Sequence, residues 1–418
     1  MKKSISIFLA IVMLLSISTV AFAEKSLTVW CWDPNFNIFA MKEAEKAYQV
    51  DNPDFKLNIV DTQWDTLQTK IITGASGDVS TLPDIFLMQD NAFQKNVISF
   101  PIFVDLTESG IDFSQFGPSK VAYSVVEDRN YGVPFDSGAA VLAVRKDLIE
   151  EAGYTMEDIT DIDWEKMIEV AKAVKEKTGV TMFKYGNPNG DFIMILLQSA
   201  GVALFNEDGS VNIKDNAVLK DIFELYKRLI AEGVVEEVTG WDEYVTALAT
   251  GGCAATIQGC WIIGSIQEGQ DLSGKWAITN IPKLNVEGGT NYSNNGGSSW
   301  AVSVNCKDTE LAFDFLNKTF GSNVSFYDSI LEKAGAIATY LPAGQSEVYL
   351  KPQEFWGGQK IYEDIVRFSG AIPAVPTGVY YYEARDEVVI ALSQVLGGMD
   401  VQQALDEAQA NVEFTMGI

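Results

Sequence analysis

Strand-like and helix-like segments alternate along most of this 418-residue chain, and this alternation restricts the fold more than any other feature. Near the start of the chain, β-type segments at 27–32, 55–60 and 84–88 are separated by helical segments at 39–50 and 64–73. Strand–helix–strand order at this spacing is typical of right-handed crossovers in a largely parallel sheet. The sequence therefore predicts an α/β fold.

The same alternation continues through the rest of the chain. Further helices are expected at 164–177, 192–200, 216–232, 241–250, 309–320 and, broken at Gly397 and Gly398, within 383–413. Further strands are expected at 139–144, 253–258 and 300–305. The stretch 288–299 is rich in Gly, Asn and Ser, which favours a long loop.

The chain is too long for one ordinary domain, so two lobes with a cleft between them are expected. Residues 131–136 are typical of a turn that feeds a long extended segment, and we place the first crossing between the lobes there. The strand at 300–305 would return to the first lobe. The expected division is an N-terminal lobe of residues 24–136 plus 301–338 and a C-terminal lobe of residues 137–300 plus 339–418.

The first residues predict export. Lys2 and Lys3 precede an apolar stretch at 5–20, and residues 21–23 form a small-x-small cleavage signal. This order is typical of a secretory signal peptide, here residues 1–23, because the apolar stretch is short and no stop-transfer run follows. No Cys closely follows the cleavage signal, so a lipid anchor is not expected, and the protein would lie in the periplasm or at the extracellular cell surface.

Charge and composition exclude several functions. The 30 basic and 57 acidic residues give a net charge of −27 at pH 7, and such a surface repels nucleic acids and anionic lipids. The chain contains no His, which excludes Ser-His-Asp catalysis, Cys-His catalysis and His-based zinc sites. We expect no cofactor and no metal.

Four cysteines are present, and an exported chain could pair them. Cys253 and Cys260 bracket an expected strand, and seven extended steps span about 23 Å, too far for a disulfide. Cys31 and Cys306 could be neighbours in the sheet. Four buried free thiols, acting as small hydrophobic residues, are the preferred interpretation.

Aromatic and polar side chains recur where the expected strands end, and ligands of open parallel sheets bind beyond these ends. A pyranose ring has a flat C–H face that packs on an aromatic ring, and carboxylates and amides can bond its hydroxyls. Any one of these residues could instead be a core Trp or a helix cap. Their recurrence predicts a sugar site with the candidate residues Trp32, Asp33, Asn35, Trp64, Asp90, Asn91, Asp136, Asp191, Trp241, Gln258, Trp261, Asn295, Trp356 and Tyr382.

Several segments, in their order along the chain, resemble the bacterial extracellular solute-binding proteins of ABC sugar importers, the group that includes maltose-binding protein. The segments that carry the resemblance are 27–33, 83–86 with Asp90, 131–135, 254–261 and 404–409. The resemblance covers nearly the whole mature chain. It implies a two-lobed periplasmic-binding-protein type II fold, hinge closure around a carbohydrate, no turnover of substrate, and docking to the permease subunits of an ABC transporter. We expect a monomer.

Carried over residue by residue, the resemblance assigns roles to four positions. Trp261 and Tyr382 match stacking aromatic residues of the family, and Asp33 and Asp90 match acids that bind sugar hydroxyls. Asn91 departs from the Arg that follows the second acid in maltose-binding protein, which counts against maltose itself as the ligand.

Two other functions remain open at this point. A ferric-ion-binding protein of the same fold is one alternative, because Tyr380–Tyr382 resemble paired Tyr ligands; the lack of His and the abundance of Trp count against it. A secreted enzyme acting on glycosides is the other, although paired carboxylates among 57 acids do not by themselves indicate a glycosidase.

Overall fold

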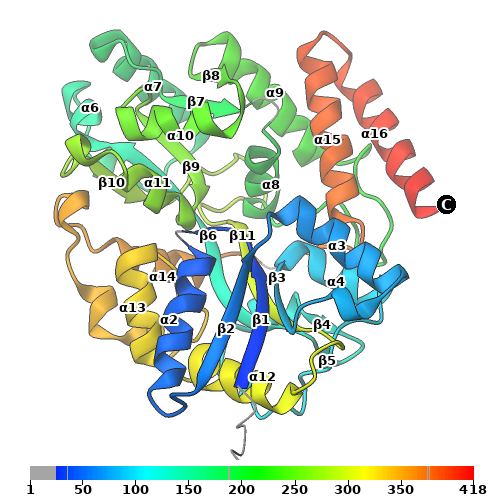
Figure 1. The fold of residues 1–418 in the computed structure, drawn as a ribbon. Coiled ribbons are helices and arrows are strands. Elements are labelled where there is room, and N and C mark those ends of the chain that lie inside the picture. Colours follow the sequence, from blue (N-terminus) through cyan, green and yellow to red (C-terminus); the bar gives the residue numbers. More distant parts are fainter. Residues whose placement is uncertain (1–24, 35, 187–188, 374, 376) are drawn as a thin grey trace, which may run out of the picture.

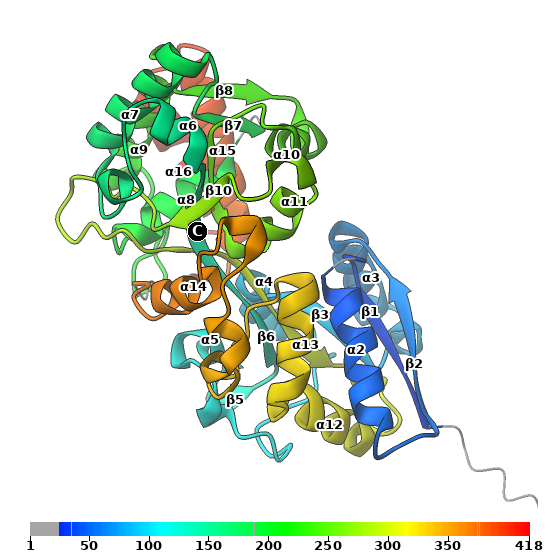
Figure 2. The same ribbon diagram turned by 90° about the vertical axis from the view of Figure 1, so that its left-hand side faces the viewer.

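The computed structural model describes residues 25–34, 36–186, 189–373, 375 and 377–418, so the expected signal peptide and Asn35 lie outside the described part. The protein has two α/β halves, and Figures 1 and 2 show one long strand that runs from one half into the other. This strand is β6 (Val133–Arg145), and β11 (Asn294–Val302) lies antiparallel beside its first part.

The sheet of the first half has the order β2-β1-β3-β11-β6. Strand β1 (Lys25–Cys31) pairs in parallel with β2 (Phe55–Asp61) and β3 (Ile85–Gln89), while β11 is antiparallel to both β3 and β6. The surrounding helices are α2 (Asn37–Gln49), α3 (Trp64–Ser76), α4 (Asp90–Ser99), α5 (Pro118–Ala122), α12 (Thr309–Leu316) and α13 (Val324–Ala334). A two-stranded ribbon, β4 (Val125–Val126) and β5 (Arg129–Asn130), lies beside this sheet.

The second part of β6 enters the sheet of the second half, where it pairs antiparallel with β9 (Ala255–Gly259) and β10 (Trp276–Thr279). The outer strands β7 (Phe183–Gly186) and β8 (Val235–Val238) are parallel, as are β7 and β9. The helices of this half are α6 (Lys146–Glu151), α7 (Trp164–Thr178), α8 (Gly190–Ser199), α9 (Ala217–Ala231), α10 (Gly240–Thr250), α11 (Ile263–Gln267), α14 (Ile361–Ser369), α15 (Tyr381–Leu396) and α16 (Val401–Met416). The expected α/β alternation is confirmed.

Helix α9 shows how the sequence specifies these elements. Its buried residues are Leu219, Ile222, Phe223, Tyr226 and Leu229, and this three-to-four-residue spacing places them on one face. The cap residue Asn216 accepts a hydrogen bond from the Leu219 N–H at 3.0 Å, which satisfies one of the unpaired donors of the first turn. Periodicity and capping act together here, and the expected range 216–232 agrees with the observed helix.

The loop expected at 288–299 is wrong over 294–299, because this stretch forms the first two thirds of β11. The small residues are needed where β11 passes β6 closely. A Cβ added to Gly138 would lie 2.3 Å from the Asn295 carbonyl oxygen, and Gly297 has a φ of 103° that favours glycine. The pairing of β11 with β6 also shifts register between Asn294 and Gly297. The Gly, Asn and Ser residues that suggested a loop therefore belong to a strand that is crowded by its neighbour and bulged.

The four cysteines are packed inside the protein as small hydrophobic residues. All four are buried free thiols, as the sequence analysis preferred, and Cys31 lies in the core of the first half. Among the described residues, we found no helix with the length and apolar character needed to cross a membrane.

Candidate ligand-binding groove

A groove of about 800 Å³ lies between the two halves and takes its lining from both. Residues after β1 and β3 line it from the first half, and residues of α8, α10, α15 and the turn after β9 line it from the second half. The groove brings together most of the candidate residues: Trp32, Asp33, Asn91, Asp136, Asp191, Trp241, Trp261, Asn295 and Tyr382.

The first-half wall is built by the turn that connects β1 to α2. The buried Asn37 side chain fixes this turn, because its Oδ1 accepts hydrogen bonds from the N–H groups of Trp32 at 3.0 Å and Asp33 at 2.9 Å. Asp33 Oδ1 accepts from the Phe36 N–H at 3.1 Å. The Trp64 ring contacts the Trp32 ring edge-on at 5.4 Å. Trp64 therefore supports Trp32 and does not itself line the groove.

The second-half wall carries a pair of tryptophans. The Trp261 Nε1–H donates to the Asn295 carbonyl oxygen at 2.9 Å, which fixes the plane of the indole ring. The Trp241 ring lies 5.8 Å from the Trp261 ring, and this side chain is 49% exposed. A Cβ on Gly259 would come within 2.2 Å of Trp261 Nε1, so the glycine makes room for the ring. The wall thus offers a fixed aromatic surface to the groove.

A chain of polar contacts lies beside these rings. Gln258 Nε2–H donates to Asp191 Oδ2 at 3.0 Å, and the Asn295 side-chain amide donates to Gln258 Oε1. Arg385 donates to the other oxygen of Asp191 at 3.4 Å. Gln258 is only 4% exposed and does not line the groove, so it contacts two lining residues from behind.

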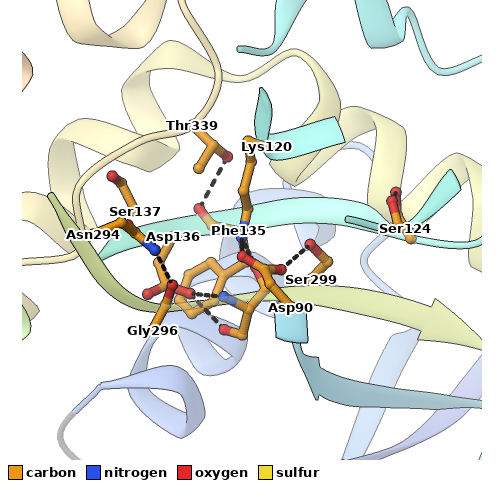
Figure 3. A network of polar contacts seen from close by, with 12 residues as sticks. Asp90, Lys120, Ser124, Phe135, Asp136, Ser137, Asn294, Gly296, Ser299 and Thr339 are labelled. Carbon is orange, nitrogen blue, oxygen red and sulfur yellow. Dashed lines mark hydrogen bonds and ion pairs between the residues drawn. The ribbon is translucent and has the colours of Figure 1, made fainter. Parts of the chain in front are cut away.

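A buried ion cluster lies next to the groove, where α4, α5, β6 and β11 meet (Figure 3), and only its members Asp136 and Ser298 line the groove. Lys120 forms an ion pair with Asp90 and donates to the Ser298 carbonyl oxygen at 2.8 Å. Ser299 donates to Asp90 at 3.0 Å, and Ser298 donates to Asp136 through both its N–H and its hydroxyl. Burial raises the pKa of Asp90 to about 6, although Lys120 acts in the opposite direction. Burial also raises the pKa of Asp136.

Comparison with known proteins identifies the group to which the chain belongs. The sequence model of the family described as bacterial extracellular solute-binding protein matches residues 43–337. The chain is a member of this family.

Relatives of this solute-binding protein bind saccharides by name. A lactose-binding protein of Rhizobium radiobacter is 41% identical over 99% of both chains. An arabinooligosaccharide-binding protein of Bacillus subtilis is 26% identical over 77% of both chains. A solved ABC-transporter-associated binding protein of B. animalis subsp. lactis, in complex with β-1,6-galactobiose, has the same fold, with a TM-score of 0.78 at 18% identity over 94% of this chain and 97% of that one. The two-lobed fold of the solute-binding protein is therefore shown.

Helix α15 joins the two halves beside the groove. The Tyr382 hydroxyl donates to Gln89 Oε1 at the end of β3, and Lys95 of α4 forms an ion pair with Glu383. Burial raises the pKa of the Tyr381 and Tyr382 hydroxyls well above the ordinary value.

Several candidates of the sequence analysis lie elsewhere in the solute-binding protein. Trp356 is 2% exposed and packs in the core of the second half beside Phe355, so its expected contact with a ligand is wrong. Asp90 and Gln258 are buried and do not line the groove, and their polar atoms are bonded within the protein. Asn35 lies outside the described residues.

Two residues near the groove, Lys120 and Arg385, were not predicted from the sequence. Lys120 carried no signal in the sequence, since its partners Asp90 and Ser298 lie 30 and 178 positions away. Arg385 could have been found, because the expected helical segment 383–413 begins one residue after Tyr382, and a spacing of three residues in a helix places two side chains on one face. The Arg385 guanidinium lies 6.0 Å from the Tyr382 ring centroid.

Proposed function

We propose that this solute-binding protein captures a neutral oligosaccharide of two or more units for an ABC importer. The observation that carries the proposal is the convergence of aromatic faces from both halves on one groove. Trp32 faces it from the first half, and Trp241 and Trp261 face it from the second half. The names of the relatives, which bind lactose, arabinooligosaccharides and galactobiose, support a saccharide.

The chemistry of the lining suits sugar hydroxyls. Asp33, Asp136, Asp191 and Asn295 present oxygen acceptors, and a pyranose hydroxyl satisfies each of them as a donor. A charged acceptor in a partly closed groove strengthens each such hydrogen bond. The volume of about 800 Å³ lies within the range of pockets that enclose small ligands and leaves room for more than one sugar ring.

Closure of the two halves around the sugar would complete the site. We propose that the lobes divide at residues 24–136 plus 301–338 and 137–300 plus 339–418, with β6 and β11 bending between them. A ligand that contacts both walls favours the closed form by its differential affinity. The closed, exported protein then delivers its cargo as a monomer to the membrane permease and performs no turnover.

A binding panel tests the proposal. Isothermal titration calorimetry with lactose, β-1,6-galactobiose and arabinobiose, together with a thermal-shift screen of neutral oligosaccharides, should identify at least one micromolar ligand with a stabilising shift. Chromatography of the recovered sugar should show no cleavage. If no neutral oligosaccharide shifts the melting temperature while ferric iron gives a coloured complex, the proposal is wrong.

A further inference from the structure

The side-chain amide of Gln258 has only one orientation that satisfies its neighbours. Its Oε1 accepts from the backbone N–H of Gly259 at 3.0 Å, and its Nε2 donates to the Asp191 carboxylate at 3.0 Å. A backbone N–H is only a donor and an ionised carboxylate is only an acceptor, so neither contact survives if the amide is flipped. The third contact follows, because Asn295 then has to present its NH2 group to Gln258 Oε1.

This orientation determines what Asn295 and Asp191 offer to a ligand. Both side chains line the groove, and one N–H of the Asn295 side-chain amide donates to Gln258. The Asn295 Oδ1 can only accept, and the same is true of the Asp191 oxygens. Gln258 itself is buried and does not reach the groove.

Other hydrogen-bond donors near the groove already donate to acceptors within the protein. The Trp261 Nε1–H donates to the Asn295 carbonyl oxygen, the Tyr382 hydroxyl donates to Gln89, and the Ser298 hydroxyl donates to Asp136. Arg385 lies against the Asp191 carboxylate and also lines the groove, so its guanidinium is a donor that remains at the edge of this wall. Apart from Arg385, the wall of Asp191, Asn295 and Trp261 presents mainly oxygen acceptors and an aromatic face to a ligand.

We propose that Gln258 is a positioning residue that makes the wall of Asp191, Asn295 and Trp261 an acceptor surface, which recognises hydroxyl donors of a neutral sugar. This inference rests on the proposed function for its ligand class. The ligand in the following tests is the tightest neutral disaccharide of the panel.

The substitution Gln258→Glu tests the positioning role through its pH dependence. At pH 8 the new carboxylate faces Asp191, so the affinity for that neutral disaccharide should fall at least tenfold relative to the wild type. Burial and the Asp191 charge both raise the pKa of the new group, and once protonated it can again donate to Asp191. At pH 5 the variant should therefore bind within about threefold of the wild type at the same pH.

Helix α16 supplies a matched control. Like Gln258, Gln409 accepts from backbone N–H groups and donates to a carboxylate: its Oε1 accepts from the N–H groups of Ile213 and Lys214, and its Nε2 donates to Glu413. It lies outside the groove. Gln409→Glu should lower the melting temperature at pH 8 but leave the affinity for the sugar unchanged, which separates loss of stability from loss of positioning.

A second variant tests the network without any sugar. In the double variant Gln258→Glu with Asp191→Asn, the new amide can donate to the new carboxylate, so the melting temperature at pH 8 should recover most of what the single variant loses. Equal melting temperatures for the single and double variants would overturn the inference even if every sugar in the panel failed to bind. Wild-type affinity of Gln258→Glu at pH 8 would also overturn it.

Discussion

The substitution Trp261→Ala tests the groove most directly, because it removes an aromatic platform that lines the groove. A pyranose face laid on the indole would remove on the order of 100 Å² of apolar surface from water, worth about 2.5 kcal/mol at ~25 cal/mol per Å². That loss corresponds to a Kd about 60-fold higher for the tightest neutral disaccharide. The Asn295 carbonyl also loses the indole donor it accepts at 2.9 Å, which adds to the effect.

Calorimetry on the purified protein measures this loss, and Trp261→Phe serves as the matched comparison. The phenyl ring keeps an aromatic face but cannot donate to the Asn295 carbonyl, so its Kd should rise by only about fivefold to tenfold. Melting temperatures measured without sugar should differ little, since Trp261 is only partly buried. A Kd for Trp261→Ala within threefold of the wild type would refute the assignment of Trp261 as a stacking platform.

Three further predictions concern the scaffold. Gly138→Ala places a Cβ within 2.3 Å of the Asn295 carbonyl oxygen and should lower the free energy of unfolding by at least ~2 kcal/mol. Gly344→Ala, whose new Cβ would have its nearest atom 3.9 Å away, should be nearly neutral. Equal urea midpoints for the two variants would contradict this prediction. Burial raises the pKa of Asp90 to about 6, so between about pH 4 and 6 the folded state binds a proton that the unfolded state lacks. This carboxyl therefore adds stability as the pH falls from 7 to 5. Urea unfolding at both pH values should show that Asp90→Asn loses this contribution. Burial raises the pKa of Cys31 and Cys253 to about 12, so a thiol reagent should label no cysteine rapidly in the native protein and all four in denaturant; fast native labelling would contradict their burial.

The sequence predicts elements well where local signals agree. Helix α9 has an apolar stripe at helical spacing and an Asn cap, and the break at Gly397 separates α15 from α16 as expected. Strand β11 was missed in part, because its small residues are required by the close approach of β6, a contact between residues more than 150 positions apart. Local composition carries no information about such a partner.

The candidate site was predicted by chemistry and not by geometry. Trp32, Asp33 and Trp261 line the groove because residues that follow strand ends lie at the same edge of a sheet. Trp356 met the same chemical criterion but is in the core, since a single sequence does not say which face of an element a tryptophan takes. Gln258 was recognised as part of the site, but only its contacts place it behind the wall.

The position of β11 between β3 and β6 has a consequence for the order of folding. The strand pairs with β3, so the edge of β3 stays open until residues beyond 294 have been synthesised. The lobe that begins the chain is thus completed late, and pairings between distant segments form slowly. We expect a newly made chain to stay unfolded for longer than its size alone would require, and a delay of this kind keeps an exported polypeptide extended until it has crossed the membrane.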